Sequence, residues 1–257
     1  MWEIARSEVW ELLSKSQETT TEPISETNIM KLPEPVQRYL RYSGVIGKEK
    51  IKTVRLKQKG FFRPSENLPW MPMIAEQYYT TNPPAFLWFG TVKALPFLSI
   101  SARDKFIDGQ GSMLVKLQSF FTLTNARGDK IDQGALLRYL GEMMWFPSAW
   151  LSDYIQWQEI DCHSVRAILN CNGLEVSAVL HLNADGQIVK LTAQRYREVK
   201  GEYALDEWEA IPMTNYQEFN GLRIPVNVEV LWKLEYGNFS YFRGEVVDIA
   251  YNNVGLY

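Results

Sequence analysis

Hydrophobic and polar residues alternate with a period of two along most of the chain after residue 50. The clearest run is IPVNVEVLWKL, residues 224–234, in which every second side chain is apolar and the opposite row is mostly polar. This alternation predicts an antiparallel strand with one buried face. Similar runs occur at residues 51–63, 73–80, 85–92, 98–109, 111–123, 164–171, 174–183, 187–197 and 237–251. We therefore expect about ten strands.

Turn residues connect several of these runs into hairpins. Asp108 to Gly111 separates the fourth and fifth runs, and Ala184-Asp185-Gly186 follows the run at 174–183. Asn220-Gly221 precedes the clearest strand. Asp-Gly and Asn-Gly pairs favour tight hairpin turns because both positions tolerate positive φ. The Pro-rich breakers NLPWMP and TNPP divide the first three strands.

Helical periodicity is found at the N-terminus. A first helix is predicted by the spacing of Trp2, Ile4, Val9, Leu12 and Leu13. The polar run SQETTTEPISET follows it as a linker. LPEPVQRYLRYSGV then predicts a second helix, with Pro35 in its first turn and Gly44 at its end.

A third helix is predicted in the middle of the chain. The segment DQGALLRYLGEMMWFPSAWL, residues 132–151, is apolar around most of a helical circumference, and Arg138 and Glu142 form a narrow polar stripe at i,i+4. Asp132 is the expected N-cap, and Pro147 ends the pattern. A large antiparallel sheet twists and curls. We therefore expect this helix, residues 132–146, to lie in the concave face of the sheet.

These elements define an α+β protein. The predicted fold is a large, strongly curved antiparallel sheet, or half-barrel, with a central helix in its concave face and helices at the N-terminus. The chain of 257 residues is predicted to form a single domain, 1–257. Residues 1–30 are its N-terminal helix and polar linker, and residues 31–257 hold the helix and the curved sheet with the inserted helix.

Composition excludes several classes of protein. Nine Trp, thirteen Tyr and twelve Phe favour a thick sheet-based core and an aromatic-lined cavity. A net charge of −3 without any Lys/Arg cluster argues against nucleic-acid binding. No apolar run reaches the roughly 18 residues that a membrane-spanning helix needs, and the N-terminal segment lacks a signal-peptide core. We expect a cytoplasmic protein without an integral membrane segment, or an extracytoplasmic or anchored one if an anchor precedes Met1.

Neither a metal nor a cofactor is expected. Cys162 and Cys171 would lie roughly 30 Å apart on one extended strand, beyond disulfide reach. The two histidines, His163 and His181, have no zinc-ligand spacing. The sequence has no G-x-S-x-G and no glycine-rich nucleotide motif. We assign no catalytic residue.

Charged residues stand at two positions where the alternation predicts a buried side chain. Asp104 lies in the apolar row of the run at 98–109, and Arg195 ends the apolar row of the run at 187–197. A buried charge is costly unless it is paired. We therefore predict a cluster of Asp104, Arg138 and Glu142 between helix and sheet, with Arg195 as a further candidate member. The cluster either fixes the position of the helix or orients a carboxylate or other head group at the polar end of an apolar pocket.

The remaining candidate ligand-binding residues lie on or next to the central helix. Tyr139, Met143 and Trp145 could line such a pocket, and core packing is the alternative for each. The leading functional hypothesis is binding or carrying of a small hydrophobic or amphipathic, lipid-like ligand between sheet and helix. The alternatives are a hydrolase that uses Asp104 and Glu142 as acid and nucleophile, and a structural or interaction module with a filled core. The oligomeric state stays open.

Several stretches together resemble a bacterial family known only as a domain of unknown function. They are LPEPVQRYLRYSG, AEQYYTTNPPAFLW, ARDKFIDGQGSM, DQGALLRYLGEMMWFPSAWL and GLRIPVNVEVLW with FSYFRGEV. The pattern DQGxLLRYLGExxWFP is the most specific part. The resemblance implies no established activity, and this sequence departs from relatives that carry an apolar N-terminal anchor. The strand order and inserted helix also resemble lipoprotein-carrier-like half-barrels, which implies a site for acyl chains between sheet and helices.

Overall fold

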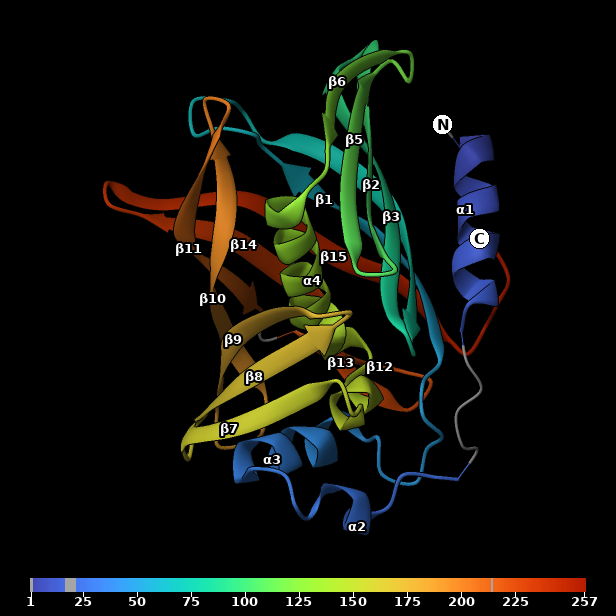
Figure 1. The fold of residues 1–257 in the computed structure, drawn as a ribbon, viewed down its shortest axis with the longest axis vertical. Coiled ribbons are helices and arrows are strands. Elements are labelled where there is room, and N and C mark those ends of the chain that lie inside the picture. The colour runs from blue at the N-terminus through green and yellow to red at the C-terminus, as the bar shows by residue number, and fades with distance from the viewer. Residues whose placement is uncertain (1, 17–21, 214) are drawn as a thin grey trace.

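The structure is a computed structural model that describes residues 2–16, 22–213 and 215–257, with side chains from Arg6 onward (Figure 1). The side chains of Trp2 and Ile4, which contribute to the first predicted helix, and residues 17–21 of the predicted linker lie outside this described part.

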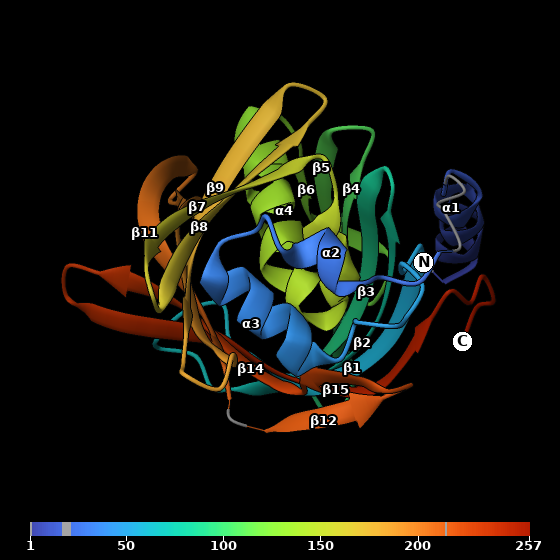
Figure 2. The ribbon, with the colours of Figure 1, turned by 90° about the horizontal axis from the view of Figure 1, so that it is seen from below.

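Thirteen strands of the described chain form one antiparallel sheet. In order across it they are β6 (Phe121–Ala126), β5 (Gln110–Leu117), β4 (Leu98–Ile107), β3 (Pro84–Leu95), β2 (Met71–Thr81), β1 (Thr53–Phe62), β15 (Gly237–Tyr251), β14 (Asn227–Leu234), β11 (Glu202–Pro212), β10 (Ile188–Val199), β9 (Leu174–Leu182), β8 (Ser164–Cys171) and β7 (Ile155–Asp161). Two more, β12 (Tyr216–Phe219) and β13 (Leu222–Pro225), pair separately. Seen from below, the sheet curves around a central helix (Figure 2). The predicted half-barrel is confirmed, with thirteen strands in place of about ten.

The three predicted hairpins are present. Asp108 and Gly109 connect β4 to β5, Gly186 lies between β9 and β10, and Asn220-Gly221 connects β12 to β13. Asn220 and Gly221 have φ values of 52° and 74°. Both central positions of this turn are therefore left-handed, which matches the twist of the flanking strands.

Two predicted strands are divided. The run at 111–123 turns at Gln118 and Ser119, whose φ values of 51° and 62° are left-handed, so it forms β5 and β6. The run at 224–234 keeps its alternating burial only from Val226 to Val230. It changes partners at Val226, since β13 pairs with β12 and β14 pairs with β11 and β15. Pro225 has no N–H with which to continue one ladder.

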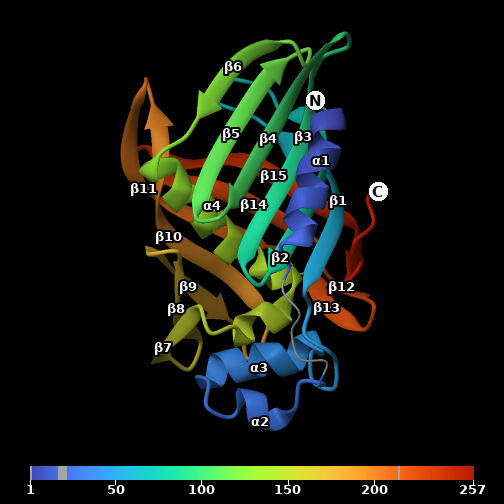
Figure 3. The ribbon, with the colours of Figure 1, turned by 45° about the vertical axis from the view of Figure 1, so that its right-hand side comes forward.

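Three helices lie outside the curve of the sheet (Figure 3). Helix α1 (Trp2–Ser14) packs Val9 and Leu12 against β2 and β3. The short α2 (Glu26–Ile29) and α3 (Glu34–Ser43) cover one end of the half-barrel. Helix α3 has Pro35 in its first turn and ends at Gly44, which has a φ of 77°, as the sequence predicts.

Helix α4 (Asp129–Glu142) lies inside the curve and continues into two 3-10 turns, η1 (Met143–Trp145) and η2 (Pro147–Leu151) (Figures 1 and 2). It begins before the predicted N-cap, because Gly128 occupies that position. The carboxylate of Asp132 instead accepts a hydrogen bond from the N–H of Gly111 at 2.6 Å. Asp132 therefore ties α4 to β5.

The apolar circumference of α4 is enclosed by the chain's own strands, as the sequence predicts. Leu136, Leu137 and Tyr139 are fully buried, and Leu140 is nearly so. Strands β5, β9 and β10 contact the helix. None of the helices in the described ranges is both long enough and apolar enough to span a bilayer.

Candidate functional site

The polar stripe of α4 meets the sheet at β2 and β4. Arg138 donates from Nη1 to Asp104 Oδ2 at 2.7 Å, from Nε to Glu142 Oε1 at 2.9 Å and from Nη2 to Gln77 Oε1 at 3.3 Å. The structure thus brings together Asp104, Arg138 and Glu142, which the sequence singled out. With Gln77 and Tyr79 they form what we call the Arg138 cluster.

Sequence reasoning missed Gln77 and Tyr79. Both donate to Glu142 Oε2, Gln77 from Nε2 at 2.7 Å and Tyr79 from its hydroxyl at 3.0 Å. Burial, reinforced by the charge of Glu142, raises the pKa of Tyr79 well above its ordinary value, so the hydroxyl keeps its proton. Gln77 is a polar residue in an apolar row of β2, and this irregularity could have identified it.

The positive charge of Arg138 is already compensated by carboxylates within its own cluster. Burial alone lowers the pKa of Arg138, but Glu142 and Asp104 outweigh burial and raise it overall. The guanidinium carbon also lies 5.1 Å from the ring centroids of both Phe86 and Trp88. Two carboxylates around one guanidinium leave the cluster with a formal charge of −1, which repels an anionic ligand. The contacts favour a role in attaching α4 to the sheet.

Arg195 lies among different residues. Its Nη1 donates to the hydroxyl of Tyr241 on β15 at 3.3 Å, and its guanidinium carbon lies 5.1 Å from the ring centroid of Trp208 on β11. Trp208 Nε1 donates to the same hydroxyl at 2.9 Å. A Cβ added at Gly134 of α4 would lie 3.4 Å from Arg195 Nε. We call these four residues the Arg195 site.

Arg195 has only uncharged partners. Among the ion pairs of the described residues none includes Arg195, so its predicted membership of the Arg138 cluster is wrong. Its cross-strand neighbour Asp206 instead accepts from Arg197 Nε at 2.7 Å. Arg195 is partly exposed, and the hydroxyl hydrogen of Tyr241 has no acceptor within the described protein.

Partly exposed apolar side chains continue the buried rows of the concave face next to this site. Ile100 and Ala102 on β4 stand opposite Val92 and Gly90 of β3. The ring of Phe62 meets the ring of Tyr241 edge to face, with centroids 6.5 Å apart. We call this surface the concave strip, and its members are Phe62, Met71, Ile100, Ala102 and Tyr241.

The other predicted ligand-binding residues lie in the core. Tyr139 and Met143 are fully buried, and Trp145 is nearly so. The hydroxyl of Tyr139 donates to the carbonyl of Thr80 at 3.0 Å, and Trp145 Nε1 donates to the carbonyl of Pro225 at 3.0 Å. Burial raises the pKa of Tyr139 well above its ordinary value. These contacts satisfy their polar groups, so we leave all three out of the proposed ligand site.

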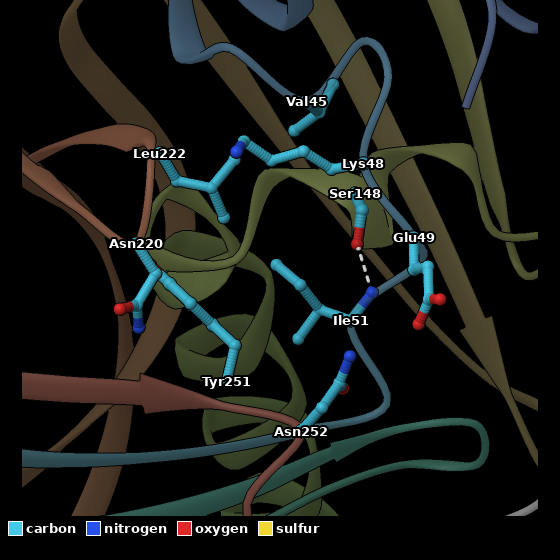
Figure 4. A pocket seen from close by; sticks show the side chains of 9 residues that line it. All are labelled: Val45, Lys48, Glu49, Ile51, Ser148, Asn220, Leu222, Tyr251 and Asn252. Atoms are coloured by element: carbon cyan, nitrogen blue, oxygen red, sulfur yellow. Dashed lines mark hydrogen bonds between the residues drawn. The ribbon is translucent and has the colours of Figure 1, made fainter. Parts of the chain in front are cut away.

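A pocket of about 170 Å³ lies elsewhere, between the α3–β1 connection, η2 and the β12–β13 turn (Figure 4). Its lining includes Lys48, Ser148 and Asn220 and none of the sequence-predicted site residues. The hydroxyl of Ser148 accepts from the N–H of Ile51 at 2.9 Å. Across the described ranges, no group of three or more His, Cys, Asp or Glu side chains is placed to hold a metal ion.

The fold defines an antiparallel half-barrel that encloses a helix. The chain belongs to a family of unknown function (DUF6544), whose model matches residues 22–244. This confirms the family resemblance. No curated protein matches the sequence.

The solved structures similar to the chain include two bacterial proteins. A domain from Vibrio parahaemolyticus, described as an outer membrane lipoprotein-sorting protein domain, is 10% identical with a TM-score of 0.45, over 80% of this chain and 87% of that one. A porin-like protein from Bacteroides uniformis is 9% identical with a TM-score of 0.27, over 79% of this chain and 97% of that one.

Proposed function

We propose that the protein binds a small amphipathic molecule, with an anionic head group at Arg195 and an apolar tail along the concave strip. The observation that carries this proposal is the guanidinium of Arg195, which is partly exposed and contacts a hydroxyl and an indole ring in place of a carboxylate. The attraction between a guanidinium and an anion is stronger beside protein groups than in bulk water, because the local dielectric constant is lower.

The neighbours of Arg195 support an anionic head group. Tyr241 accepts from both Arg195 and Trp208, and its own hydroxyl hydrogen is directed to neither. A carboxylate or phosphate next to Arg195 can therefore accept from the guanidinium and from Tyr241 together. Charge-assisted hydrogen bonds of this kind are stronger than neutral ones. Arg138 does not offer the same opportunity, because two carboxylates already neutralise it.

The concave strip supports an apolar tail. Its residues come from four strands, and Tyr241 belongs both to the strip and to the Arg195 site. A ligand site of this type combines an extended apolar lining with a few polar groups that fix the orientation of the ligand. A fatty acid or a similar lipid-like anion has this shape and polarity.

The contacts of Asp104 and Glu142 argue against the hydrolase alternative. Both carboxylates of the suggested pair, Asp104 and Glu142, are bound by the guanidinium of Arg138. Asp104 is 4% exposed. An acid and a nucleophile must reach the substrate, and these groups are engaged in attaching α4 to β2 and β4.

Native mass spectrometry of the purified protein tests the proposal. We expect the wild type to carry, or to take up from added palmitate, one molecule of lipid-like mass. Arg195→Gln should lose this mass, and Arg41→Gln should keep it because Arg41 pairs with Glu26 on the helices that cover the end of the half-barrel. Gly134→Leu is a second variant, which places a bulky side chain against Arg195 and should also exclude the ligand. A wild type that takes up no palmitate, or an Arg195→Gln variant that retains it, would overturn the proposal.

A further inference from the structure

Two hairpin turns meet at the end of the half-barrel opposite α2 and α3 (Figures 1 and 3). One connects β3 to β4 and the other connects β5 to β6. The N–H of Gln118 donates to the carbonyl of Ser99 at 2.9 Å, and the hydroxyls of Ser101 and Ser119 are 3.2 Å apart. The Gln118 side chain also donates to the carbonyl of Phe97. The two turns are therefore held together.

Large apolar side chains project from these turns into solvent. Phe97 is 94% exposed and Phe120 is 83% exposed. Phe121, Leu95 and Leu123 are 71%, 63% and 54% exposed. We call these five residues the apolar tip. Single exposed apolar residues are common on proteins, but a group of five at two joined turns marks an interaction surface.

The surroundings of the apolar tip are basic. Lys93 faces Ser99 in the β3–β4 ladder, and Lys116 faces Thr122 in the β5–β6 ladder, so both lie next to the turns. Residues 77–103 and 109–128 contain no Asp or Glu, although the whole chain has a net charge of −3. None of the ion pairs within the described ranges involves either lysine.

We propose that the apolar tip docks the half-barrel on the surface of an anionic lipid bilayer. Phenylalanine and leucine side chains enter the boundary between head groups and acyl chains, while Lys93 and Lys116 lie against the anionic head groups. The exposed side chains of the apolar tip can insert into a lipid bilayer, because lipids are fluid and rearrange around them. The positive charge at the turns selects an anionic bilayer over a neutral one.

This inference goes beyond the proposed ligand binding and stands on different residues. The two are nevertheless adjacent, because β4 carries Ile100 and Ala102 of the concave strip and begins at the β3–β4 turn. A docked half-barrel would present the strip close to the bilayer. Loss of palmitate uptake in Arg195→Gln and loss of docking in tip variants are therefore separate outcomes.

Vesicle flotation of the full chain tests the proposal. The probes are vesicles of pure phosphatidylcholine and vesicles with equal parts of phosphatidylcholine and phosphatidylglycerol. We expect the wild type to bind the anionic vesicles, and we expect Phe97→Ser/Phe120→Ser to weaken binding by about tenfold or more. Ile160→Ser/Tyr236→Ser is the matched control, since both positions are also highly exposed but lie on other turns or strands. It should bind like the wild type.

Charge variants and the oligomeric state complete the test. Lys93→Gln/Lys116→Gln should weaken binding several-fold and reduce its dependence on salt. The far-ultraviolet circular dichroism of every variant should match the wild type, because the exchanged side chains are exposed or partly exposed. Three results would overturn the proposal: binding that survives the tip substitutions, equal binding to neutral vesicles, or a wild-type dimer that the tip substitutions dissociate.

Discussion

Arg138 of α4 donates a 2.7 Å hydrogen bond to Asp104 of β4, so an ion pair joins the enclosed helix to the sheet around it. The same guanidinium binds Glu142. The side chains of Asp104 and Glu142 are only 5% and 14% exposed. We expect Arg138→Met to lower the free energy of unfolding by about 3–5 kcal/mol, because it leaves two largely buried carboxylates without a counter-charge. Urea denaturation measures this loss.

The Arg197–Asp206 pair is the matched control for that substitution. Its side chains are 23% and 24% exposed, and its hydrogen bond has the same length of 2.7 Å. Solvent screens such a pair more strongly, so Arg197→Gln should cost about 1 kcal/mol or less. Equal losses in the two variants would contradict a special role of the Arg138 cluster in holding α4.

The contact between α4 and β5 leaves no room for a side chain at Gly111. A Cβ there would lie 2.7 Å from the carbonyl oxygen of Ile131 and 3.0 Å from the Cβ of Ala135. Because the nearer atom belongs to the helix backbone, it cannot move aside alone. We expect Gly111→Ala to destabilise the protein by about 1–3 kcal/mol in thermal or urea unfolding. An unchanged stability would mean that α4 does not pack this closely on β5.

The tyrosines around α4 predict an alkaline limit to stability. Burial raises the pKa values of Tyr79 and Tyr139 well above 10.0, and it raises the pKa of Tyr154 to about 12. A tyrosine whose pKa is higher in the folded than in the unfolded chain stabilises the fold as long as it stays protonated. This contribution to the free energy of unfolding is complete below the pKa of the unfolded chain, and it is lost as the pH rises through the pKa of the folded chain. Stability should therefore fall above about pH 10.

Spectroscopic titration checks this expectation. Tyrosinate absorbance from these buried residues should appear together with unfolding, as monitored by circular dichroism. Comparison with Tyr139→Phe isolates the contribution of Tyr139, which contacts both Tyr79 and Tyr154. Ionisation of Tyr139 near pH 10 in a folded chain would show that water reaches the interior beside α4, contrary to the closed core described above.

Local sequence patterns predict the half-barrel and its enclosed helix. Alternation of apolar and polar residues indicates the strands, and turn residues indicate which consecutive strands form hairpins. They missed the β5–β6 turn, where Gln118 and Ser119 adopt positive φ without the Gly, Asn or Pro that normally marks such a turn. They also misplaced the start of α4, because Asp132 bonds to Gly111 in place of its own helix end. The hydrogen bond of Asp132 to Gly111 depends on the packing of α4 against β5, which the sequence around Asp132 does not indicate.

The sequence likewise predicts only part of the candidate sites. Asp104 and Arg138 were predicted as partners because each charge needed one, and the structure confirms this pair. Gln77 and Tyr79 lie more than 55 residues away from Arg138 in the sequence. The fold of the sheet around α4 brings Gln77 to Arg138 and Tyr79 to Glu142. Arg195 was expected in the same cluster, but the pairing of β10 with β11 places it beside Trp208 and Tyr241. Its partners depend on register, which one sequence does not fix.

The central claim is that Arg195 recognises the negative charge of an amphipathic ligand. The most direct measurement compares equilibrium binding of palmitate and of its uncharged methyl ester to the wild type and to Arg195→Gln. We predict that the wild type binds palmitate about tenfold or more tightly than the ester, and that Arg195→Gln binds the two equally. Equal binding by the wild type, or a preference for palmitate that survives in Arg195→Gln, would contradict the claim.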